Sequence, residues 1–176
     1  MTGVGLAVIV GYLFHAATHL RRSHPEELIW ACHLGALAVA AGLIGRWPLP
    51  VAVGVEWLVV GNLFWLVGLG LGGEFLPTTL LTHLGGLVAG LYGLRAIGVV
   101  AGAWHIAAVA LVALWAVTWF VTPARTQVNL AHGIQPGFEQ LVPWYSVYIV
   151  VIFVACLGLF AGTETALLRA GFHAVS

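Results

Sequence analysis

The sequence predicts an all-α protein, a bundle of about six transmembrane helices, from its composition and the lengths of its apolar segments. Of the 176 residues, 61% are hydrophobic and only 7% are charged, and the charged residues are Arg and Glu alone. An average soluble domain has about 25% charged residues. A soluble globule of this size needs more polar surface than this chain supplies. The composition therefore excludes an ordinary soluble domain, a disordered chain and a nucleic-acid-binding protein, which needs a basic surface.

Six apolar segments approach the length of about 20 residues that a membrane-crossing helix needs. They cover residues 2–20, 27–44, 51–71, 77–99, 103–120 and 143–161. Arg21 and Arg22 end the first, Pro77 stands in the first turn of the fourth, where proline is tolerated, and Pro123 closes the fifth. Six such helices use about 120 residues. We therefore expect one integral membrane domain over residues 1–176, in a multi-pass protein of the cell membrane.

Two further features concern the connections and the helix faces. Residues 124–142 form the only long loop and the most polar part of the chain, and loops of that size are often functional. Gly86 with Gly90, and Gly98 with Gly102, have the small-residue spacing that lets helix backbones approach closely. We expect these glycines to pack inside the bundle, and a homodimer through the same faces is the alternative.

Most histidines fall on one side of the membrane when they are placed on the six-helix topology. These are His15, His19, His24, His33, His83 and His132. Cys32, Glu74, Asn129, Glu139 and Tyr145 fall on the same side. Polar and ionisable groups are costly inside a bilayer, and they usually mark a functional site. The sequence therefore predicts a histidine-rich polar site at one membrane face.

Metal or haem binding is one chemistry that suits this cluster. His15 and His19 are four residues apart, so they share one face of a helix, as in a two-ligand metal site. Zinc would need further ligands, which we expect among His33, His83, Cys32 and Glu74. A b-type haem would need two histidines from different helices, for example His19 and His83. The sequence has no H-E-x-x-H or C-x-x-C motif, so this prediction rests on composition.

Acyl transfer is the second chemistry, and it needs no cofactor. Cysteine acts as a nucleophile when a neighbouring base raises its thiolate fraction. Cys32 and His83 lie on different predicted helices at comparable depth, so we interpret them as nucleophile and general base. We expect membrane lipids as substrates. Residues of the long loop and the start of the last helix are the predicted substrate contacts: Asn129, His132, Trp144 and Tyr145.

Three stretches resemble the YwaF-type integral membrane family. Residues 129–136, followed by residues 138–145, look like the Asn-Tyr … Pro … Leu-Leu-Asp … Pro-Trp-Tyr run that leads into the last helix of that family. Leu63-Phe64-Trp65, Pro77 and His83 look like its Phe-Trp helix, loop proline and following histidine, and residues 30–34 are similar to its Leu-His-Leu-Cys helix. Eukaryotic relatives of this family are membrane acyltransferases that act on ether phospholipids. The resemblance implies a helical membrane fold and a lipid acyltransferase or hydrolase.

Three functional hypotheses follow from the sequence. The first is a lipid acyltransferase or hydrolase that uses Cys32 and His83. The second is a metal- or haem-binding membrane protein with ligands among His15, His19, His33 and His83. The third is a small transporter or channel in which the histidines relay protons or metal ions.

Overall fold

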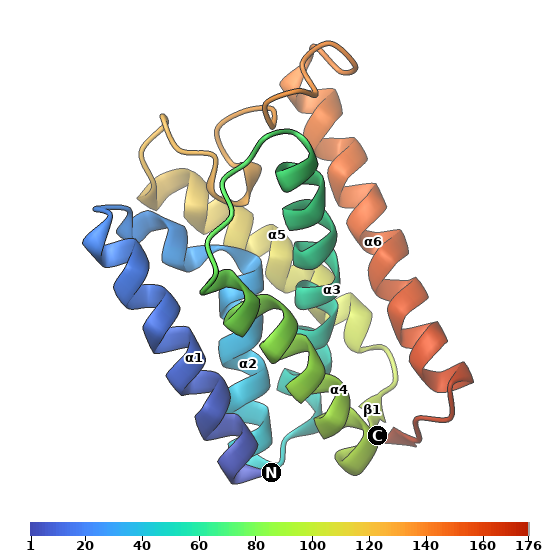
Figure 1. Ribbon diagram of the computed structural model, residues 1–176. Coiled ribbons are helices and arrows are strands. Elements are labelled where there is room, and N and C mark those ends of the chain that lie inside the picture. The colour runs from blue at the N-terminus through green and yellow to red at the C-terminus, as the bar shows by residue number, and fades with distance from the viewer. Residues whose placement is uncertain (176) are drawn as a thin grey trace.

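The computed structural model describes residues 1–175 and is an all-α bundle (Figure 1). Its helices are α1 (Thr2–Arg21), α2 (Ala31–Gly45), α3 (Pro48–Gly70), α4 (Gly86–Ile97), α5 (Ala103–Val121) and α6 (Tyr145–Arg169). Three short turns accompany them: the 3-10 turns η1 (Pro25–Ile29) and η3 (Val128–Leu130), and the π-helical turn η2 (Leu81–Gly85). Two short strands, β1 (Val99–Val100) and β2 (Ala174–Val175), pair in parallel.

Four of these helices are long and apolar enough to cross a membrane: α1, α3, α5 and α6. Large apolar side chains point outward from them, including Phe14, Val109 and Phe120. In water such surfaces would associate or aggregate, whereas lipid chains cover them without cost. The fold is therefore that of a membrane protein.

Two of the expected helices begin later than the sequence indicates. The second was expected from residue 27, but Pro25–Ile29 forms a separate 3-10 turn and α2 starts at Ala31. Trp30 has extended backbone angles, and they interrupt the helix. The fourth was expected from Pro77, but helical residues begin at Thr79, directly before η2. The remaining helices lie where expected, and α6 continues two turns further, to Arg169.

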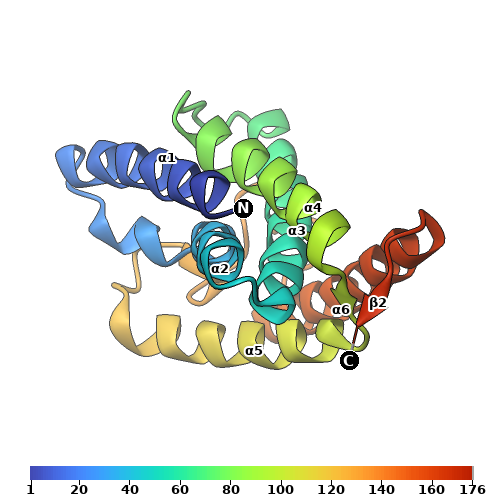
Figure 2. The ribbon, with the colours of Figure 1, turned by 90° about the horizontal axis from the view of Figure 1, so that it is seen from below.

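The 15-residue helix α2 lies at the centre of the bundle. Figure 2 shows it nearly end-on, with α1, α3 and α4 around it. Ala36, Val39 and Leu43 have no exposed surface, so α2 needs no polar face. A Cβ atom on Gly54 of α3 would lie 2.5 Å from the carbonyl oxygen of Gly35 in α2, so only glycine permits this approach. This close packing fixes the first turn of α2, which carries Cys32 and His33.

The glycines of the fourth helix also serve the interior of the bundle. A Cβ atom on Gly90 would lie 2.4 Å from Val55, and one on Gly86 would lie 3.2 Å from Leu58, both on α3. These two residues therefore pack against the bundle core, as the small-residue spacing predicts.

Candidate functional site

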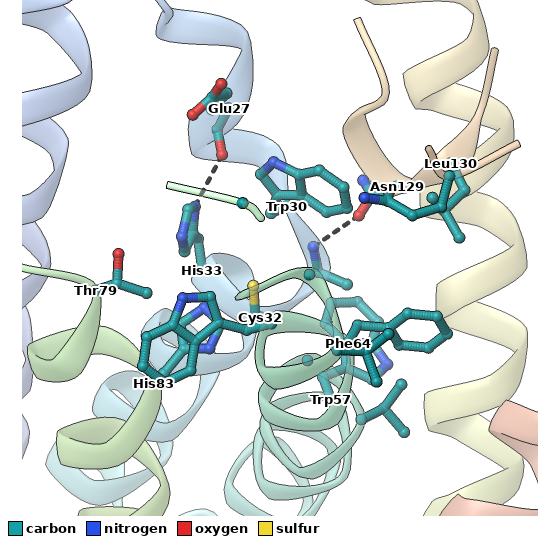
Figure 3. A pocket seen from close by; sticks show the side chains of 18 of the residues that line it. Glu27, Trp30, Cys32, His33, Trp57, Phe64, Thr79, His83, Asn129 and Leu130 are labelled. Carbon is teal, nitrogen blue, oxygen red and sulfur yellow. Dashed lines mark hydrogen bonds between the residues drawn. The ribbon is translucent and has the colours of Figure 1, made fainter. Parts of the chain in front are cut away.

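A cavity of about 500 Å³ lies between the helices and is lined by both polar and apolar side chains. Its polar end is formed by α1, η1, the start of α2 and η2, and five histidines line the cavity: His15, His19, His24, His33 and His83. Its apolar part extends along α3, α5 and α6. The side chains there include Trp57, Phe64, Leu111, Trp115, Ile152, Phe153, Cys156 and Phe160. Figure 3 shows Cys32, His33 and His83 together, with Trp57 and Phe64 nearby.

Three of the histidines meet through their Nε2 atoms. The Nε2 atom of His15 lies 2.9 Å from that of His33 and 3.0 Å from that of His19. His15 and His19 come from successive turns of α1, and His33 comes from the first turn of α2. All three side chains are buried, with at most 4% of their surface exposed. We call these three residues the histidine triad.

The outward nitrogen of each triad ring has a partner. The Nδ1 atom of His33 donates to the backbone carbonyl of Glu27 at 2.8 Å (Figure 3), and that of His19 lies 2.8 Å from the Glu27 carboxylate. The Nδ1 atom of His15 lies 3.0 Å from the Thr78 hydroxyl. The hydrogen bond with His19 lowers the pKa of the Glu27 carboxyl. One residue of η1 therefore orients two of the three rings.

Cys32, His33 and His83 form a second group, in which the sulfur and one nitrogen of each ring lie within 4.8 Å of one another. His83 stands in the π-helical turn η2, and π-turns occur frequently at functional sites. Its buried Nδ1 atom has no hydrogen-bond partner within residues 1–175. Cys32 is a free, buried thiol. The structure therefore brings the predicted nucleophile and base together at the polar end of the cavity.

Asn129 lies in the wall of this cavity and holds the long loop against α2. Its Oδ1 atom accepts from the Ala31 backbone N–H at 2.8 Å (Figure 3), so it caps α2 from a residue far along the chain. Its two amide protons go to the carbonyl of Ile29 and the hydroxyl of Thr118, each at 2.9 Å. A substrate that takes a hydrogen bond from Asn129 would have to displace one of these partners.

The other predicted substrate contacts lie outside the residues that line this cavity. The Tyr145 hydroxyl is close to the carbonyls of Leu130 and Ala131, and His132 bonds to Thr122. Trp144 is 69% exposed. These three residues shape the loop that covers the cavity, and their contact with a substrate stays a prediction.

Two residues that contact the histidine triad belong to no sequence motif that could have identified them. Glu27 stands at the predicted start of a helix and Thr78 beside Pro77, and no local pattern links either one to a histidine. Their contacts depend on how α1 packs against the segments that follow it. His24, which we also expected in the cluster, bonds to Glu26 instead of joining the triad.

Comparison with known proteins adds no assignment. No family model matches the chain, and no curated protein or solved structure matches it significantly. The resemblance to the YwaF-type family therefore stays a prediction from the motifs.

Proposed function

We propose that this protein is a membrane-embedded enzyme that transfers or hydrolyses the acyl group of a lipid bound in the cavity. The observation that carries the proposal is that a thiol and an unpaired imidazole, Cys32 and His83, meet at the polar end of an otherwise apolar cavity. The volume of about 500 Å³ is in the range of cavities that enclose small organic ligands.

The shape of the lining favours a long apolar chain. The residues of α6 that line the cavity run from Ile149 to Phe160, which corresponds to about 16 Å along the helix axis. The side chains along this length are aliphatic, aromatic or Cys156. A lipid chain that lies beside α6, with its ester group toward α2, therefore places the carbonyl carbon near Cys32.

The reaction then proceeds in two balanced steps. The Cys32 thiol gives its proton to His83 while sulfur bonds to the carbonyl carbon. The carbon–oxygen bond of the ester breaks, and the leaving alcohol takes the proton from His83. In the second step an acceptor alcohol or water gives a proton to His83 and attacks the thioester. The thiol is regenerated and an ester or a fatty acid is released.

The position of Cys32 assists the first step. Cys32 is the second residue of α2, and the positive end of a helix dipole favours a nearby negative charge. Transfer of the proton to His83 leaves a thiolate beside an imidazolium, so the pair as a whole gains no net charge in a buried site.

An acyl-exchange assay in lipid vesicles tests the proposal. Purified protein is incubated with phospholipid carrying an isotope-labelled acyl chain, and transfer to other lipids or release as fatty acid is measured by mass spectrometry. We expect Cys32→Ala and His83→Gln to lose activity by a factor of 100 or more, since general-base catalysis alone contributes about 100- to 10,000-fold.

Cys156→Ala is the matched control, because Cys156 is a second buried thiol in the same cavity, on α6 beside Phe160. We expect it to lose far less activity than Cys32→Ala, because Cys156 only lines the part of the cavity proposed to hold the lipid chain. Full activity of Cys32→Ala would refute the assignment of the nucleophile.

A further inference from the structure

We infer that the histidine triad, His15, His19 and His33, binds a divalent transition-metal ion, with zinc as the best fit. This inference is independent of the proposed acyl chemistry, which uses Cys32 and His83.

The hydrogen bonds around the triad decide where its protons lie. A backbone carbonyl only accepts, so the Nδ1 atom of His33 must carry a proton toward Glu27. The carboxylate of Glu27 likewise receives a proton from the Nδ1 atom of His19. In the neutral rings the Nε2 atoms of His19 and His33 then carry a lone pair and no proton. Both of these atoms face the Nε2 atom of His15.

Three neutral imidazoles cannot make good hydrogen bonds at both of these Nε2–Nε2 contacts. The Nε2 atom of His15 carries at most one proton, which points in one direction in the ring plane. That proton makes one good hydrogen bond with one neighbour. The lone pair of the other neighbour then faces the same nitrogen at about the same distance, with no proton between the two atoms. With the proton of His15 on Nδ1, toward Thr78, all three lone pairs converge without a proton between them. A cation among the three nitrogens resolves every one of these contacts.

The distances fit a metal ion. Zinc binds histidine nitrogen at about 2.0–2.1 Å, so two such ligands in a tetrahedral site lie about 3.3 Å apart. The observed separations of 2.9 and 3.0 Å differ from this by a few tenths of an ångström. Small rotations of the side chains close this difference. One ring nitrogen of each of the three histidines lies within 4.8 Å of the others, so they suit a single ion, whereas haem needs axial ligands on opposite faces of a macrocycle.

The surroundings of the triad are those of a metal site. Histidine ligands of metals almost always donate their second ring N–H to a carboxylate, a carbonyl or water, and these partners fix the ring orientation. Glu27 supplies both a carboxylate and a carbonyl, and its negative charge offsets part of the charge of the ion. Three histidines also leave one coordination position free, as in catalytic zinc sites. All three line the cavity, so a ligand in the cavity reaches that position.

The experiment measures metal binding directly and needs no activity. Protein purified in detergent is stripped with a chelator, and Zn²⁺ or Co²⁺ is then titrated in. Bound metal per chain is measured by inductively coupled plasma mass spectrometry, and Co²⁺ coordination by visible absorption. We expect about one ion per chain and the d–d bands of a tetrahedral Co²⁺ site with nitrogen ligands.

Variants locate the ion. We expect His15→Gln and His33→Gln to lose stoichiometric binding, and Glu27→Ala to weaken it by about 10- to 100-fold. His24→Gln and His105→Gln are matched controls, because both histidines lie outside the triad, and they should bind as the wild type does. Gel filtration and circular dichroism show which variants fold. Should a triad variant fail to fold, Glu27→Ala and the Co²⁺ spectrum of the wild type carry the test.

Three outcomes overturn the inference: no stoichiometric Zn²⁺ or Co²⁺ binding by the folded wild type, binding that survives in folded His15→Gln and His33→Gln, or a Soret band of bound haem that needs the triad. Cys32→Ala separates this inference from the proposed function. It removes the proposed nucleophile and should leave metal binding intact.

Discussion

Replacement of Asn129 by alanine tests whether one side chain holds the long loop on the bundle. Asn129 makes three hydrogen bonds, with the backbone of Ile29, the backbone of Ala31 and the hydroxyl of Thr118. Each of these partly buried hydrogen bonds contributes about 1 kcal/mol net. Asn129 also has a φ of 50°, a left-handed conformation that costs alanine about 1–2 kcal/mol. We therefore expect Asn129→Ala to lower the free energy of unfolding by about 4–5 kcal/mol.

Unfolding in detergent, followed by tryptophan fluorescence, measures this loss, and hydrogen exchange locates it. The backbone amide of Ala31 and residues 124–142 should exchange faster in the variant, since the amide of Ala31 loses its acceptor. Gln140→Ala is the control, because Gln140 is an exposed residue of the same loop, and it should change stability by no more than about 0.5 kcal/mol. If Asn129→Ala changes stability as little as this control, the loop is held by other contacts and our reasoning is wrong.

Three further predictions concern packing and charge. Gly61→Ala should cost about 1–3 kcal/mol in stability, because its Cβ atom would lie 2.4 Å from that of Cys32; an unchanged melting temperature would contradict this close packing. Glu56→Met should raise the melting temperature. Glu56 is 2% exposed and its Oε2 atom has no hydrogen-bond partner within residues 1–175, and a buried polar atom without a partner destabilises the fold. A lower melting temperature would contradict this reasoning. The free energy of unfolding should fall as the pH drops through and below 4.5, because the hydrogen bond with His19 lowers the pKa of Glu27 in the folded state. Glu27→Gln should make the free energy of unfolding depend less on pH in this range. An unchanged pH dependence in this variant would exclude Glu27 as its source.

The sign of the pH effect follows from proton binding. A lowered pKa means that the folded protein binds fewer protons than the unfolded chain near and below pH 4.5. The contribution of Glu27 is therefore fully present above that range, and it is lost as the pH falls through the folded-state pKa.

Hydropathy predicted the helices well because lipid requires long apolar segments with satisfied backbones. It placed the ends of α1 and α5 within one residue, and the loops between the segments placed His15, His19, His33 and His83 on one side. The i, i+4 spacing on α1 also predicted that His15 and His19 share a face, and their Nε2 atoms lie 3.0 Å apart.

The contacts that complete the polar end of the cavity could not be predicted from the sequence, because they depend on tertiary packing. Glu27 orients two histidines only because the chain forms a 3-10 turn and Trp30 is extended, and hydropathy instead extends the helix through this region. The cap that Asn129 places on Ala31 joins residues 98 positions apart. The π-helical turn that carries His83 has no marker in the residues around it. Each of these features is set by neighbouring elements and not by local preference.

The most direct measurement of the proposed chemistry is a search for an acyl group on Cys32. The purified protein is mixed with phospholipid, quenched in acid and digested, and its cysteine peptides are analysed by mass spectrometry. We expect an acyl mass on the Cys32 peptide that hydroxylamine removes, that is absent from Cys156, and that His83→Gln abolishes. An unmodified Cys32 in protein that turns over lipid, together with turnover by Cys32→Ala, would contradict the role of Cys32 as nucleophile, and a protein without any lipid turnover would contradict the proposed function.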